Sequence, residues 1–76
     1  MLDTFFGPKV KDMDGMFFGA TSFNGDISKW NVSSVWNMNA MFFEATSFNG
    51  DLLNWDVSKV RDRGKMFYRA TSFTQE

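Results

Sequence analysis

Acidic residues at a regular spacing are the side chains in this sequence with the clearest capacity for chemistry. Asp26, Asp51 and Glu76 follow one another at intervals of 25 residues, and the first two each come directly after an Asn-Gly pair. A column of carboxylates beside such turns could contribute to a Ca²⁺ site, which requires several oxygen ligands. Alternatively, each Asp accepts hydrogen bonds from the backbone of its own turn. Because only one carboxylate recurs per interval, we favour the turn and predict no metal and no other cofactor.

The residues available for catalysis are few. The 76-residue chain contains no histidine and no cysteine, which removes the commonest general base and the thiolate nucleophile. Lys59, Lys65 and Tyr68 remain, together with carboxylates that recur singly rather than as a general acid and base pair. We therefore expect that the protein is not an enzyme.

Aromatic residues are the candidates for binding a partner. Three rings share one phase of the interval, off the main apolar stripe: Phe18, Phe43 and Tyr68. Trp36 precedes Phe43 by seven residues, and the polar residues Lys11 and Arg61 share its phase, so we expect Trp36 to be exposed. Exposed rings form contact surfaces for proteins or stack on sugars. We favour an internal ladder for the three recurring rings and leave contact and packing both open for Trp36.

A pair of asparagines predicts a structural ladder. Asn24 and Asn49 occupy one phase, and Thr74 follows at the same phase. If successive intervals stack, the two amides lie in a column and can bond to the backbone of the neighbouring interval, as buried turns require.

The interval itself indicates the architecture. The segments 16–26, "MFFGATSFNGD", and 41–51, "MFFEATSFNGD", differ at one position, and 66–76 is a looser third copy. A fixed period of this size is typical of a solenoid of stacked coils. We predict one domain over 1–76, with about three coils: a partial unit 1–9, full units 10–34 and 35–59, and a terminal unit 60–76.

Within one unit, the apolar spacing predicts mixed secondary structure. Met13, Met16, Phe17 and Ala20 lie on one stripe at 100° per residue, which indicates a short helix over about 11–20. The pair 24–25, Asn-Gly, predicts a turn at positive φ, the alternation at 30–32 predicts an extended segment, and the serines at 33–34 can cap the next helix.

These repeats carry a family likeness. The sequences "MFFGATSFNGDISKWNVSSV" and "MFFEATSFNGDLLNWDVSKV" resemble the 25-residue repeats of BspA-like and mycoplasma-type surface lipoproteins, a bacterial domain family without an assigned function. The resemblance implies a leucine-rich-repeat-like solenoid, often at a cell surface and sometimes adhesive. It transfers no catalytic residue.

Charge separates the two ends of the chain. Residues 60–76 carry four basic and two acidic residues, a net +2, whereas 1–59 carry four basic and seven acidic residues, a net −3. No nucleic-acid motif accompanies the basic cluster, and no run is long enough to span a membrane. We predict a non-catalytic interaction module for a protein or glycan. The alternative is an assembly unit that stacks head-to-tail, because Asp12 and Asp14 lie at one end of the stack and the cations at the other.

Overall fold

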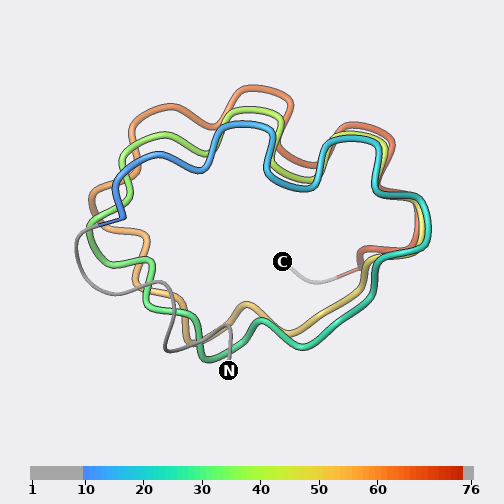
Figure 1. Ribbon diagram of the computed structural model, residues 1–76, viewed down its shortest axis with the longest axis horizontal. Helices are drawn as coiled ribbons and strands as arrows, with labels where there is room; N and C mark the ends of the chain where they lie inside the picture. The colour runs from blue at the N-terminus through green and yellow to red at the C-terminus, as the bar shows by residue number, and fades with distance from the viewer. Residues whose placement is uncertain (1–9, 75–76) are drawn as a thin grey trace.

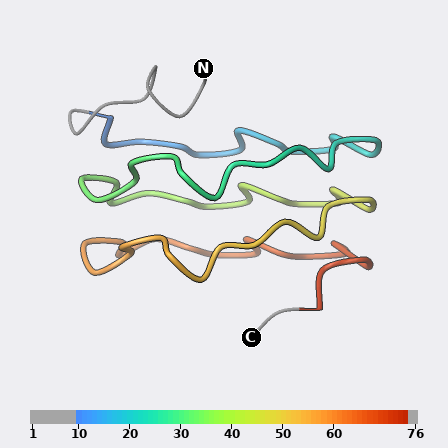
Figure 2. The same cartoon turned by 90° about the horizontal axis from the view of Figure 1, so that it is seen from below.

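The computed structural model describes residues 10–74, and the chain runs through them in three superimposed passes. We name these passes layer 1 (10–34), layer 2 (35–59) and layer 3 (60–74). Seen from above, the three follow nearly the same outline (Figure 1), and seen from the side they lie one above another (Figure 2). Equivalent residues of neighbouring layers are therefore in contact.

The predicted mixed α/β, leucine-rich-repeat-like solenoid is wrong. Residues 10–74 contain neither a helix nor a strand, and the segment 11–20 that we expected to be helical consists of turns. The ladder structure within this range is limited to two isolated parallel bridges, Asp12 with Asn37 and Asn37 with Asp62. The extended segment expected at 30–32 forms no strand either, because a turn at 28–29 precedes it.

Consecutive tight turns replace the helix. Within layer 1, the N–H groups of Met16, Phe18 and Ala20 donate to carbonyls three residues earlier, at 3.0 to 3.2 Å. The intervening N–H groups, of residues 13, 15, 17 and 19, instead donate to layer 2 at 2.7 to 2.9 Å. Half of the backbone donors thus close turns and half join layers. Such turns advance the chain in steps of four residues, so they reproduce the spacing that indicated a helix.

The turns require backbone at positive φ. Gly15 and Gly19 have φ of 64° and 69°, and Ala40 and Glu44 occupy the same phases in layer 2 at 54° and 55°. Layer 3 repeats this at Lys65. A left-handed conformation costs a non-glycine residue roughly 1–2 kcal/mol. The hydrogen bonds between layers and the packing beneath them must offset that cost.

The Asn-Gly segments differ from the prediction as well. Neither Asn24 nor Gly25 adopts positive φ, and turns at 21–22 and 28–29 flank them instead. Glycine is needed here for space: a Cβ on Gly25 would lie 2.8 Å from the Phe23 ring, and one on Gly50 would lie 2.6 Å from the Phe48 ring. The predicted capping role of the serines also fails, since Ser33 donates to the side chain of Asn31.

Stacked phenylalanines form the centre of the core. One inner column has centroid separations of 5.4 and 5.3 Å, and consists of Phe17, Phe42 and Phe67. A second runs beside it at 5.8 and 5.9 Å, and consists of Phe23, Phe48 and Phe73. Within each layer the two columns stack on each other at 4.2 to 4.4 Å. Phe42 and Phe48, in the middle layer, are completely buried.

Candidate binding surface

The rings of Phe18, Phe43 and Tyr68 stack into a column on the outside of the molecule, which we call the outer ring column. The Phe18 and Phe43 centroids are 4.6 Å apart with an interplanar angle of 1°, and those of Phe43 and Tyr68 are 5.0 Å apart at 28°. Phe18 is 58% exposed and Tyr68 43%. The internal ladder that we favoured for these rings is therefore wrong: they do form a ladder, but it faces solvent.

The stacking determines which part of each ring a partner can reach. Both faces of Phe43 are covered by its neighbours, so the column presents ring edges along its length. The edge of an aromatic ring carries partial positive charge. At the Tyr68 end, the Arg69 guanidinium lies 5.3 Å and the Lys65 ammonium 5.7 Å from the ring centroid. The column is thus an apolar ridge with an electropositive rim.

Trp36 forms a separate surface. Its side chain is 42% exposed, and it lines a shallow hollow of about 500 Å³ together with Lys59 and Arg61 of the next layer. Among the described residues no ring contact joins Trp36 to Phe43, although the sequence analysis placed them together. The four aromatic candidates therefore divide into the outer ring column and one isolated tryptophan.

Asparagine side chains join the layers at two places. The Asn24 Oδ1 accepts the N–H of Asn49 at 2.8 Å, and the Asn49 Oδ1 accepts the N–H of Thr74 at 3.1 Å. This is the arrangement that the repeat phase suggested. A second connection was missed: the Asn39 Oδ1 accepts the N–H of Gly64 at 2.6 Å. The polar residue at this phase, Asp14 in layer 1, was visible in the sequence but was read only as charge.

The recurring carboxylates are engaged in local turns. Asp26 accepts from the Ser28 hydroxyl at 2.7 Å and from its N–H at 3.0 Å, and these bonds lower the pKa of Asp26. Ser58 lowers the pKa of Asp56 in the same way. Asp51 accepts the Leu53 N–H at 2.9 Å. Glu76, the third member of the predicted column, lies outside the described residues. Within 10–74, no group of three or more acidic side chains is close enough to hold a metal.

The fold and this surface define a small domain of stacked tight turns that displays a ridge of aromatic rings. The chain belongs to the family described as "Mycoplasma protein of unknown function, DUF285", whose model matches residues 2–76. No curated protein and no solved structure matched the chain. A search of the described residues for a helix able to cross a membrane found none.

Proposed function

We propose that the protein is a non-catalytic binding module, and that the outer ring column contacts a protein partner. The exposure of three stacked rings carries this proposal: solvent-facing aromatic clusters are typical of contact surfaces, and aromatic side chains dominate binding energy at protein interfaces. The likeness to repeats of BspA-like surface lipoproteins supports a role at a cell surface or outside the cell.

The geometry of the column favours a protein over a glycan. A sugar stacks on the face of an aromatic ring, whereas Phe43 offers only its edge. Ring edges and the neighbouring cations Lys65 and Arg69 suit a surface that combines apolar side chains with carboxylates or carbonyl oxygens. Trp36 is a second candidate contact, because its ring is exposed and carries no stacked neighbour among residues 10–74.

Panning a displayed random-peptide library and a glycan array against the protein tests the proposal. We expect peptides that bind the wild-type chain and lose binding to Phe43→Ala, while the thermal melt of that variant stays close to wild type. Leu53→Ala is the matched control, because Leu53 is 73% exposed and lies away from the column. Binding of glycans alone, or peptide binding that Phe43→Ala leaves intact, would contradict the proposal. Loss of binding with Trp36→Ala instead would assign the site to Trp36.

A further inference from the structure

The last layer presents a row of backbone donors without acceptors. Eight N–H groups join the layers, and each donates to the carbonyl 24 residues further along the chain. Layer 1 donates from residues 13, 15, 17 and 19, and layer 2 from residues 38, 40, 42 and 44. The equivalent donors of layer 3 are those of residues 63, 65, 67 and 69, and none of them has an acceptor in the described chain. An unpaired row of this kind is a template for another chain.

The first layer presents the complementary row. Carbonyls at one phase accept these bonds, in layer 2 at residues 37, 39, 41 and 43 and in layer 3 at residues 62, 64, 66 and 68. The same phase in layer 1 is residues 12, 14, 16 and 18, whose carbonyls accept from no described residue. Three intervals of 25 residues carry the carbonyl of residue 12 to the position that the N–H of residue 63 requires. The two edges therefore match in direction, spacing and register.

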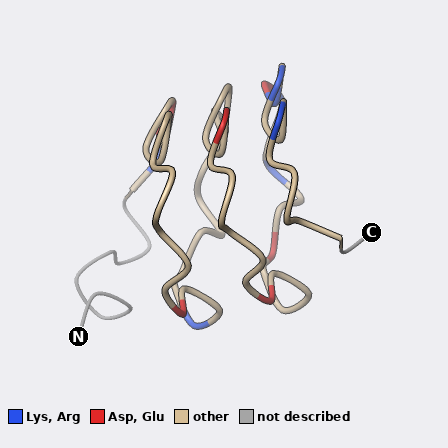
Figure 3. Ribbon diagram, turned by 90° about the vertical axis from the view of Figure 1, so that its right-hand side faces the viewer, with Lys and Arg blue, Asp and Glu red and all other residues tan. Residues whose placement is uncertain are grey.

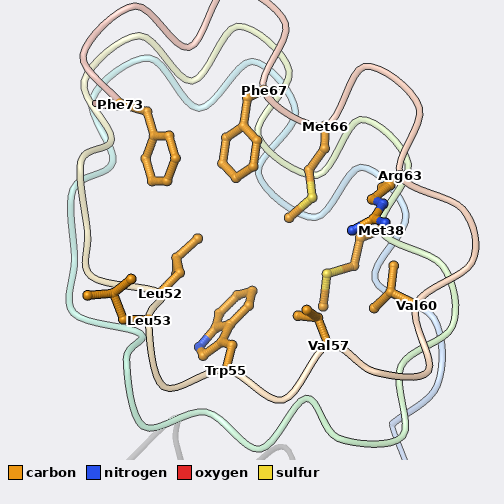
Figure 4. A pocket seen from close by; sticks show the side chains of 10 residues that line it. All are labelled: Met38, Leu52, Leu53, Trp55, Val57, Val60, Arg63, Met66, Phe67 and Phe73. Carbon is orange, nitrogen blue, oxygen red and sulfur yellow. The ribbon is translucent and has the colours of Figure 1, made fainter. Parts of the chain in front are cut away.

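An apolar cavity of about 580 Å³ lies beside the free donors. Figure 4 shows its walls, with Leu52, Trp55 and Val57 from layer 2 facing side chains from layer 3. Val57 is 40% exposed, whereas Val32, at the same phase one layer earlier, is 1% exposed. The difference is the cover that one further layer would supply.

Charge selects which edges meet. Lys and Arg gather on the last layer, as Figure 3 shows, and Arg63 and Lys65 belong to its donor row. Asp12 and Asp14 belong to the acceptor row of layer 1. Two last layers would repel each other, while a last layer attracts a first layer. The cations that would otherwise deter edge pairing here favour one orientation of it.

We propose that a second copy of this chain docks its layer 1 onto layer 3, continuing the backbone register between copies. The carbonyls of residues 12, 14, 16 and 18 of the incoming copy accept the N–H groups of residues 63, 65, 67 and 69, and the copy covers the apolar cavity. The two surfaces are different, so the contact is heterologous, and it propagates into a filament unless the rotation closes a ring.

Light scattering over a dilution series tests whether the copies associate. We expect the molar mass to rise with concentration and to fall at about 1 M salt, where charges are screened within roughly 3 Å. A monomer at millimolar concentration and low salt would overturn the proposal.

A charge exchange tests which edges are in contact. Arg63→Glu places a carboxylate opposite Asp12 and Asp14 of the next copy, and we expect it to weaken association by about tenfold or more. Asp14→Lys should do the same from the other edge. A mixture of the two variants should recover association, because each mutated edge finds a complementary partner. Lys29→Glu makes the same change in net charge away from both edges and should have no effect. Failure of the mixture to recover, in variants whose melts match wild type, would overturn the assignment.

Amide hydrogen exchange tests the backbone register directly. We expect the N–H groups of residues 63, 65, 67 and 69 to exchange freely in dilute protein and to become protected in concentrated protein. Residues 38, 40, 42 and 44 should be protected in both. Association that leaves the four layer 3 amides unprotected would show that a different surface mediates it, and would overturn the proposal.

Discussion

The inner and outer ring columns differ by one position in the sequence and have opposite environments. Phe42 is completely buried between two rings of the inner column, while Phe43 is half-buried between two rings of the outer one. Centroid separations are similar in both, at 5.4 and 4.6 Å for the contacts with layer 1. Ring stacking between layers is therefore common to both columns. What distinguishes them is the area removed from water, which determines whether a ring stabilises the fold or remains available to a partner.

The largest expected effect separates the two columns directly. Phe42→Ala removes a fully buried ring from the centre of the core and should destabilise the protein by about 3–5 kcal/mol. Phe43→Ala should cost only about 1 kcal/mol, the size of an aromatic pair. Urea titration of both variants, followed by circular dichroism, measures the difference. Equal losses would mean that the outer column is part of the core.

The sequence placed the inner column correctly and could not separate it from the outer one. Met13, Met16, Phe17 and Ala20 define an apolar stripe whether the backbone is helical or turns every four residues. The stripe therefore predicts the side that faces the core and leaves the backbone undecided. Gly15 and Gly19, four residues apart, were the available signal for repeated turns at positive φ. Layer 2 hides that signal, because it carries Ala40 and Glu44 at those phases.

The exposure of Phe18 was not predictable from its residue type. A phenylalanine that recurs beside a buried phenylalanine looks like core, and only the turn geometry directs it outward. By contrast, the contact between Asn24 and Asn49 follows from the period alone, because equal phase places them in adjacent layers regardless of the backbone between them. Long-range register is thus easier to derive from a repeat than local conformation.

A third column, made of amides, extends the comparison to polar contacts. Asn49→Ala removes the acceptor for the Thr74 N–H, and the net value of one such hydrogen bond is about 1 kcal/mol. We expect a lower melting temperature with the fold retained. Asn54→Ala is the control, because Asn54 is exposed and has no side-chain hydrogen bond within the described chain. Identical melts for the two variants would show that the amide column does not stabilise the stack.

The turns that direct neighbouring rings to opposite sides can be tested at Ala40. Ala40→Gly relieves a left-handed residue and, after the greater entropy of glycine in the unfolded chain is subtracted, should stabilise the protein by up to about 1 kcal/mol. Ala20→Gly should instead destabilise, because Ala20 is equally half-buried and is not at positive φ. Chemical denaturation measures both. A loss of stability with Ala40→Gly would mean that its methyl group contributes more than the strain costs.

The smallest effect concerns carboxylates that bond within one layer and join no column. Ser28 and Ser58 lower the pKa values of Asp26 and Asp56 below the ordinary value of 3.8. A carboxyl group whose pKa is lower in the folded state stabilises that state above its unfolded pKa. This contribution is lost as pH falls through the folded value. Melting temperature should therefore decline below about pH 4, and less steeply when Ser28 and Ser58 are both alanine. Because both carboxylates are fully exposed, the change in slope should be small beside the loss caused by Phe42→Ala. A slope unchanged by the double substitution would show that these turns are equally formed in the unfolded chain.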